Sequence, residues 1–301
     1  MKSKTIRIIA LILIVAGVGI FAYPWVSSWW NERASREVVA QYAEDAAVLT
    51  PAQIDEEFEI AYAYNLKVSG LAPYDPFSEK EPVPFPEYAE ILAPGGSAVM
   101  AYIEVPSIDL SLPVYHGVAD SVLARGIGHM PTTALPVGGE GTHCVLVGHN
   151  AIPSRELFTH LDKVKKGDAI IIHVLDRTLG YRVDQITVAK PEDTEALLPV
   201  AGKDYLSLVS CTPYGVNSHR IYVRGVRDDS VIGETVAPAG PLIPGKVLVA
   251  GLVTAVIMTG ILIVVYRRRK RLDSRDKPGN DDGVNAGNDD GENAGNGESD
   301  A

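Results

Sequence analysis

The sequence predicts a mainly β domain, a closed barrel or a sandwich, preceded by a helical hairpin and flanked by two transmembrane helices. Three observations lead to this prediction: evenly spaced β-type runs, helical spacing ahead of them, and two long apolar segments. The β-type runs are short, are separated by turn residues, and occupy residues 99–105, 112–115, 143–149, 169–175, 181–188, 205–211 and 219–226. This even spacing favours a barrel or sandwich with short crossover helices over βαβ units. The crossover helices are expected at residues 121–125, 154–162 and 192–197.

Two apolar segments, residues 8–25 and 247–266, are each long enough to cross a bilayer as a helix. Lysine and arginine precede the first segment, and five basic residues, 267–271, follow the second. The positive-inside rule therefore predicts a plasma-membrane protein with two spans, both termini in the cytoplasm and the intervening domain outside the cell. A cleaved signal peptide is the alternative for the first segment. Its length and the bulky tryptophans around its end favour a retained span.

The domain organisation follows from changes in composition along the chain. It comprises a cytoplasmic N-terminus with the first span (1–30), an extracellular helical segment (31–68), a proline-rich loop (69–95), the β domain (96–230), a linker (231–246), the second span (247–266) and a cytoplasmic tail (267–301). The helical segment contains a capping box at Thr50 and Gln53, with Pro51 at the first helical position. Six prolines in the following loop predict an extended surface segment without regular structure.

The formal net charge of −11 belongs largely to the tail, which is first basic and then rich in Asp, Asn, Gly and Glu. Such a composition cannot bury enough apolar surface to fold, so we expect a disordered cytoplasmic tail. The outer domain has no basic stripe interleaved with aromatic residues. Nucleic-acid binding is therefore not expected.

Cys211 is the residue most indicative of function, because it ends a β-type run directly before a Pro-Gly turn. A second run begins at His219, and antiparallel pairing of the two runs would bring Arg220 close to Cys211. Alternation along the strand would place Arg220 opposite the apolar face of Ile221 and Val223. A thiol beside a guanidinium in an open groove indicates nucleophilic chemistry.

Each of these residues also has an ordinary structural interpretation. Cysteine is commonly a small buried hydrophobe, and on the oxidising side of a membrane Cys211 and Cys144 could form a disulfide. Arg220 could be a solvated charge at a strand edge. Spacing alone does not distinguish His149 from the other candidate histidines, which are His129, His143 and His219. A metal site formed by His143 and His149 lacks a clear third ligand.

Three blocks of sequence resemble the sortase family. They are residues 141–149 ending in Gly148-His149, residues 157–168, and residues 207–220 with Ser210-Cys211-Thr212-Pro213 and Arg220. The resemblance covers residues 31–227, with the blocks in the family's order and spacing, and is strongest to the class C, pilus-assembling type. Members of that class carry a lid with an Asp-Pro-aromatic anchor. Asp75-Pro76-Phe77 in the proline-rich loop is similar to it, although the same tripeptide could be an ordinary turn.

The resemblance implies a closed sortase-type β-barrel of about eight strands and a cysteine transpeptidase of the Gram-positive cell envelope. Cys211 would attack an LPxTG-like sorting signal after its threonine, and the resulting thioester would pass to a lysine amine of a pilin. His149 would act as general acid and base, and Arg220 would stabilise the oxyanion or hold the peptide backbone of the substrate. No metal and no organic cofactor is expected. The implied partners are pilin subunits or other surface proteins with sorting signals, a lysine or cell-wall amine, and the lipid bilayer.

If 69–95 is such a lid, Asp75 is expected to pair with Arg220, and Phe77 is expected to cover Cys211. The sequence departs from the family's frequent residues at Asn150, Ala151 and Ser210. Two other functions remain open. One is a housekeeping sortase that attaches proteins to peptidoglycan, and the other is a surface binding or scaffold protein without catalytic activity. The lid tripeptide and the second span favour pilus assembly over the housekeeping role.

Overall fold

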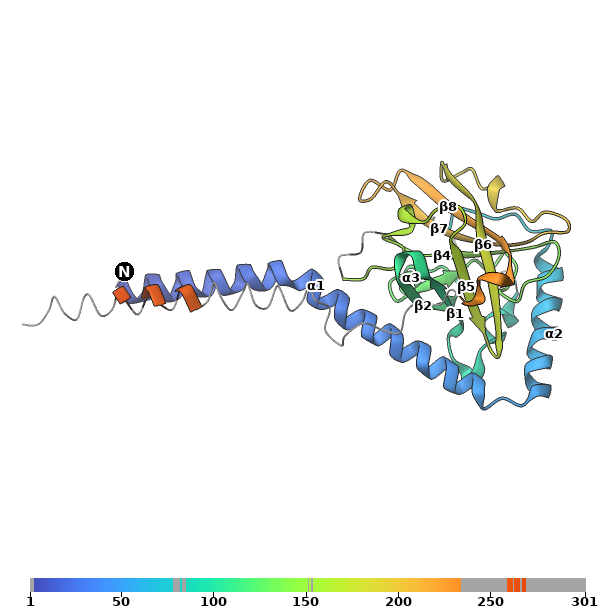
Figure 1. The fold of residues 1–301 in the computed structure, drawn as a ribbon, viewed down its shortest axis with the longest axis horizontal. Coiled ribbons are helices and arrows are strands. Elements are labelled where there is room, and N and C mark those ends of the chain that lie inside the picture. The colour runs from blue at the N-terminus through green and yellow to red at the C-terminus, as the bar shows by residue number, and fades with distance from the viewer. Residues whose placement is uncertain are drawn as a thin grey trace, which may run out of the picture. The chain divides into compact units, whose positions relative to one another are not determined.

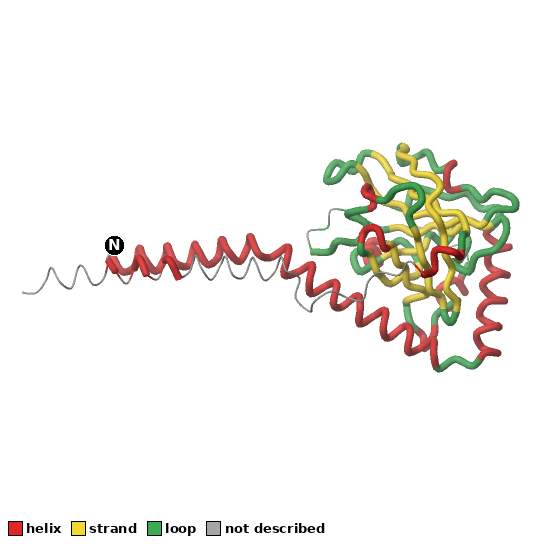
Figure 2. Tube along the Cα trace, viewed as in Figure 1, coloured by secondary structure: helices red, strands yellow, loops and turns green. Residues whose placement is uncertain are grey.

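The computed structural model describes residues 3–77, 82, 85–150, 152, 154–233, 259–261, 263–265 and 267–268. Most of the predicted linker, second span and tail, residues 231–301, lies outside the described residues. Within the described part, the chain forms a β-barrel with two long helices on its N-terminal side (Figure 1). Figure 2 shows the strands gathered in one body, with loops and short helical turns around them.

Eight strands of the described chain close into a barrel in the order β1-β2-β3-β4-β7-β8-β6-β5. Their bounds are β1 Val99–Val105, β2 Leu110–His116, β3 Ile127–His129, β4 Thr142–Val147, β5 Ala169–Val174, β6 Arg177–Ala189, β7 Asp204–Thr212 and β8 His219–Arg227. The prediction of a closed barrel is confirmed. The sequence did not reveal β3, because three residues are too few to show a strand period.

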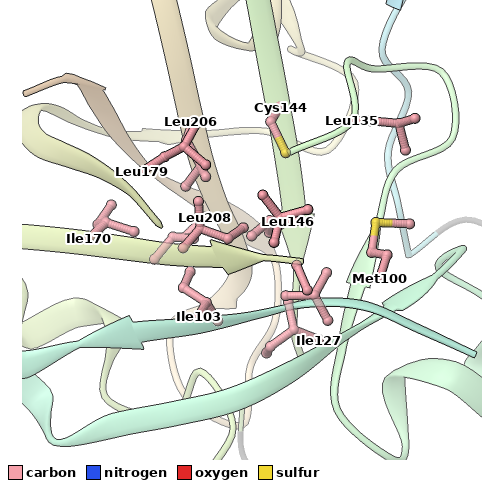
Figure 3. Close-up of a cluster of buried hydrophobic side chains, with 14 of the residues drawn as sticks. Met100, Ile103, Ile127, Leu135, Cys144, Leu146, Ile170, Leu179, Leu206 and Leu208 are labelled. Atoms are coloured by element: carbon pink, nitrogen blue, oxygen red, sulfur yellow. The ribbon is translucent and has the colours of Figure 1, made fainter. Parts of the chain in front are cut away.

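Strand alternation separates two apolar surfaces of the sheet. Cys144 and Leu146 of β4 lie with Leu206 and Leu208 of β7 in the main core, and Figure 3 shows these four side chains in the same cluster as Ile103. The alternate residues, such as Val145 and Val209, pack in a separate cluster on the outer face. Because β4 and β7 run parallel with Cys144 opposite Leu206, the two strands keep the same alternation along their whole length. Side chains at the ends of β4 and β7 therefore point toward the outer face next to one another.

The two N-terminal helices are α1, Ser3–Ala47, and α2, Pro51–Val68. The capping box at Thr50 is confirmed, since its hydroxyl accepts from the Gln53 amide nitrogen and the Gln53 side chain accepts from the Thr50 amide. The helices diverge from their short connection (Figure 1). Each is tied to the barrel by a buried tyrosine: Tyr42 donates to the Met100 carbonyl at 2.8 Å, and Tyr64 donates to the Pro131 carbonyl at 2.6 Å.

Among the residues that the structure describes, none of the helices has both the length and the apolar character needed to cross a bilayer. Many side chains of the predicted first span, residues 8–25, and most of the predicted second span, residues 247–266, lie outside that description.

The helix expected at residues 154–162 is wrong, and the expectations for two other segments were incomplete. Residues 154–162 do not form a helix; they form turns and one short 3-10 segment at Leu161–Lys163. Leu157 takes a positive φ of 32°, which a helix does not accommodate. The proline-rich loop contains 3-10 segments at Pro86–Glu90 and Pro94–Gly96, because proline suits the first position of a helical turn. The predicted helix near 121–125 is α3, Asp120–Leu123, and the one near 192–197 is reduced to the 3-10 turn Glu195–Leu197.

Candidate active site

Cys211 and Arg220 form a directly opposed pair on neighbouring strands. The antiparallel register of β7 and β8 places Cys211 across from Arg220, as the sequence predicted. The loop between the strands, residues 213–218, is exposed at one end of the barrel. Both side chains are nevertheless well covered, with exposed fractions of 8% for Cys211 and 6% for Arg220.

The pair belongs to the outer face of the sheet. Ile221 and Val223 point into the main core, as alternation predicted, whereas Tyr222 joins the outer cluster. The outer cluster consists of Val118, Leu123, Met130, Val145, Val147, Ala189, Leu197, Val209 and Tyr222. Tyr74 and Phe77 of the predicted lid pack against it. The thiol of Cys211 thus sits at the end of an apolar surface against which two side chains of the predicted lid pack.

His149 is brought to this end by the parallel pairing of β4 with β7. Just beyond β4, the Gly148 amide donates to the Val209 carbonyl at 3.0 Å, and Ser210 Oγ donates to the Gly148 carbonyl at 2.8 Å. Glycine is required at 148, because a Cβ there would lie 2.7 Å from the Phe158 ring. Asn150, two residues after Gly148, donates a hydrogen bond from its side-chain amide to the backbone carbonyl of Cys211.

The Asp75-Pro76-Phe77 anchor contacts both Arg220 and His149. Asp75 accepts two hydrogen bonds from Arg220, at 2.8 Å from Nε and 2.9 Å from Nη2. The Phe77 ring lies 5.4 Å from the His149 ring, centroid to centroid, and 4.9 Å from the Arg220 guanidinium carbon. The predicted pairing of Asp75 with Arg220 is therefore present. Phe77 lies against the residues on either side of the thiol, and its direct cover of Cys211 stays a prediction.

The predicted lid has one further attachment that the sequence did not reveal. Thr194, in the loop before β7, donates to the Pro73 carbonyl at 3.2 Å. Arg220 Nη1 donates to the backbone carbonyls of Asn217 and His219, each at 3.1 Å. Every nitrogen of the Arg220 guanidinium is thus bound in this closed arrangement.

The environment favours the neutral forms of the thiol and the imidazole. Burial raises the pKa of Cys211; Arg220 opposes this shift and Asp75 adds to it. Burial lowers the pKa of His149, with a smaller opposing effect from Asp120. Burial works against the charge of Arg220, but the hydrogen bonds and charge of Asp75 leave its pKa raised. The closed site therefore holds an uncharged Cys–His pair beside a permanently charged arginine.

The other candidate histidines have structural partners. His129 is fully buried, bonded to the Ala134 carbonyl, and its pKa is lowered to about 3 by burial. His143 contacts the Leu198 carbonyl and Ser207 Oγ, at 3.1 and 2.7 Å, and burial lowers its pKa to about 4. His219, at the start of β8, has its ring 2.9 Å from Ser218 Oγ. The contact of His149 with Phe77 places that imidazole, rather than those of His129 and His143, under the lid.

The disulfide alternative is wrong, because both cysteines of the chain lie in the described part and carry free thiols. Cys144 points into the main core and Cys211 to the outer face, so the two sulfurs lie on opposite sides of the sheet. Burial raises the pKa of Cys144 well above its usual range. Cys144 is an inert core residue.

Within the described residues, no group of three or more His, Cys, Asp or Glu side chains is arranged to hold a metal ion. The metal site considered for His143 and His149 gains no support, since both ring nitrogens of His143 contact protein oxygens.

Sequence reasoning missed Asn150 as a contact of Cys211, and it missed Asn217. Asn217 takes a positive φ of 59°, a conformation that asparagine tolerates better than most residues. An asparagine within a Pro-Gly turn was an available signal for this. No local signal announced the hydrogen bond of Asn150, because its acceptor is 61 residues away.

A closed eight-stranded barrel with a cysteine, a histidine and an arginine at one end of its outer face defines a sortase-type cysteine transpeptidase. A family model described as a sortase domain matches residues 103–228, which include all three residues. A Streptococcus pneumoniae sortase C, described in connection with catalysis and pilin substrate specificity, is 41% identical with a TM-score of 0.60; the match covers 64% of this chain and 96% of that one. Sortase C-1 from Actinomyces oris is 43% identical with a TM-score of 0.55, covering 59% of this chain and 99% of that one.

A curated relative, Sortase A from Streptococcus agalactiae, is 28% identical over 118 residues, which is 38% of this chain and 47% of the relative. The chain spans about half the length of the first curated relatives it matches. The matches to the solved class C structures cover nearly the whole length of those chains. The chain belongs to the sortase family, and its structural neighbours are class C sortases.

Proposed function

We propose that this chain is a pilus-assembling transpeptidase that cleaves an LPxTG-like sorting signal and joins the released end to a lysine amine of a pilin. The observation that carries the proposal is the Cys211–Arg220 pair, closed by Asp75 and Phe77 and flanked by His149. The proposal is also supported by the similarity to a sortase C that is described in connection with pilin substrate specificity.

In the first half of the reaction, Cys211 passes its thiol proton to His149, and its Sγ attacks the carbonyl carbon of the threonine in the sorting signal. The tetrahedral intermediate collapses with cleavage of the threonine–glycine bond, and His149 supplies the proton that the departing glycine amine takes up. The products are a thioester on Cys211 and a free glycine amine. Dividing the exchange in this way replaces one difficult step with two easier ones.

In the second half, the lysine amine attacks the thioester carbonyl. The C–S bond breaks, and the extra proton on the new amide nitrogen passes to His149 and then to the leaving thiolate. Cys211 is thereby restored as a thiol, and the pilin is held through an amide bond. The neutral Cys–His pair of the closed site is the starting state for this cycle.

Arg220 would stabilise the negative oxygen of both tetrahedral intermediates, a contribution of roughly 10²–10³ in rate for a comparable donor. In the closed site its Nε and Nη2 are bonded to Asp75. The oxyanion can use these donors only after Asp75 has left. Release of the lid is therefore a required step before the first chemical step.

The proposed location is the plasma membrane, with the barrel outside the cell and both termini in the cytoplasm. Support for it comes from the apolar segments 8–25 and 247–266 and the basic residues next to them. The same arrangement would hold the enzyme where secreted pilins with C-terminal sorting signals emerge.

The proposal is tested by incubating the full chain with an LPxTG peptide and either a lysine-containing pilin peptide or a triglycine acceptor. An amide bond to the lysine side chain, absent with Cys211→Ala, is the expected product. Preferential transfer to triglycine would instead indicate a housekeeping sortase. A chain that leaves every peptide intact, with or without the lid anchor, would indicate a non-catalytic scaffold.

A further inference from the structure

Asn150 directly follows His149 and connects the end of β4 to the nucleophile. Its side-chain Nδ2 donates to the backbone carbonyl of Cys211. Because a carbonyl oxygen can only accept, this contact fixes the orientation of the amide: Nδ2 faces Cys211, and Oδ1 faces the other way. The usual ambiguity between the two ends of an asparagine side chain is thereby removed.

Asn150 Oδ1 is buried and has no hydrogen-bond donor among the described residues. A buried acceptor without a partner is unfavourable, and such atoms are few in native proteins. The tie to Cys211 uses the other end of the amide and leaves this oxygen without a donor in the described barrel. Within that part of the chain, the oxygen is an unpartnered acceptor on the residue that follows His149, and its side chain is bonded to the backbone of Cys211.

We propose that Asn150 Oδ1 accepts a hydrogen bond from the amine that resolves the Cys211 thioester, and so favours transfer to an amine over hydrolysis by water. This inference rests on the proposed function. It assigns to the acceptor amine a binding group that is separate from the general base and from the oxyanion donor.

Because Asn150 Oδ1 is a hydrogen-bond acceptor, its expected partner is an amine rather than the oxyanion. An amide oxygen would repel the developing negative oxygen of the intermediate, whereas an amine or ammonium group offers it an N–H. A lysine side chain arrives as an ammonium ion, and a charge-assisted hydrogen bond is about twice as strong as the neutral bond that water would make. Asn150 would therefore hold the amine more strongly than its competitor.

The protons balance in this arrangement. One N–H of the incoming group is held by Asn150 Oδ1, and one proton is lost to solvent to give the neutral amine. Its lone pair forms the new C–N bond as the C–S bond breaks. The surplus proton on nitrogen is taken by His149 and returned to the thiolate of Cys211. Asn150 gives and takes no proton; it orients the nitrogen.

The test uses the full chain, an LPxTG peptide and Nα-acetyl-lysine amide as acceptor, with the amide and acid products separated by mass spectrometry. Both products arise from the same thioester, so their ratio reports only on the second half of the reaction. Asn150→Ala is expected to lower the amide-to-acid ratio about 3- to 10-fold, the range for one hydrogen bond. It is also expected to raise the acceptor concentration needed for half-maximal transfer.

Ser210→Ala is the matched control, because it removes another side-chain tie between the same two strand ends, from Ser210 Oγ to the Gly148 carbonyl. It is expected to leave the product ratio unchanged. An unchanged ratio in Asn150→Ala, or an equal fall in both variants, would overturn the inference and leave the proposed function standing. A parent chain that forms neither product would overturn both.

Discussion

The carboxylate of Asp75 holds the guanidinium of Arg220 through two hydrogen bonds, 2.8 Å from Nε and 2.9 Å from Nη2, across 145 residues of chain. Only 8% of the Arg220 side chain and 17% of the Asp75 side chain are exposed, so the pair is largely shielded from solvent. A bidentate, shielded pair of this kind is directional as well as attractive. It keeps the anchor closed over the site while occupying the donors that catalysis would need.

Asp75→Asn is expected to open the lid more often, because it removes the charge that Arg220 binds. A weakening of about 1.4 kcal/mol would raise the open fraction about tenfold. The measurement is the rate at which a methanethiosulfonate reagent modifies Cys211. Asp184→Asn is the control, since Asp184 makes a similar bidentate pair with Arg224 at 3.0 and 2.7 Å. Equal effects of the two substitutions would show that the change is general rather than specific to the lid.

Phe77→Ala is expected to increase hydrolysis of an LPxTG peptide, because the ring contacts both His149 and the Arg220 guanidinium. Since Phe77 and Asp75 hold the same segment, the double variant should gain less than the product of the two single effects. Steady-state rates of peptide cleavage provide the comparison. A rate that is unchanged or lower in Phe77→Ala would argue against gating by the lid.

The pH dependence of Cys211 alkylation is expected to report the closed lid. Burial and the Asp75 carboxylate raise the pKa of Cys211, while Arg220 lowers it. Because iodoacetamide reacts with the thiolate, the rate in the parent should rise at higher pH than for an ordinary cysteine. In Asp75→Asn the midpoint should move to lower pH, since one raising influence is lost and the lowering influence of Arg220 remains. A shift to higher pH would contradict this electrostatic picture.

The barrel is expected to lose stability in mild acid. Burial lowers the pKa values of His129 and His143 to about 3 and about 4. These two side chains therefore stay neutral in the folded chain at pH values where the unfolded chain, with histidine pKa values near 6.5, binds protons. Their stabilising contribution is complete above that pH and is lost as the pH falls toward the folded values. Between pH 6.5 and 5 each histidine should cost about 2 kcal/mol of unfolding free energy.

Urea unfolding at the two pH values measures this loss. His143→Gln should reduce the difference between them, whereas His160→Gln, whose side chain is 38% exposed, should not. An identical pH difference in the parent and in His143→Gln would contradict the assignment.

The sequence predicted the parts of the site that depend on neighbouring residues in the chain. Cys211 and Arg220 flank a short turn, so hairpin pairing and alternation were enough to place them together. The capping box of α2 is equally local.

The remainder depends on contacts between distant segments. His149 reaches the site through parallel pairing of β4 with β7, and nothing near His149 encodes that pairing. The orientation of the Asn150 amide, the tie from Thr194 to Pro73 and the positive φ at Leu157 arise in the same way. The three-residue strand β3 exists because its neighbours supply both of its partners.

The most direct test of this account is mass spectrometry of the full chain after a brief incubation with an LPxTG peptide, followed by acid quenching and digestion. The account predicts an acyl group ending at the threonine, attached through a thioester to Cys211 and present in Cys144→Ala. It would be contradicted by a chain that cleaves the peptide without acylation of Cys211, or by an adduct that survives in Cys211→Ala.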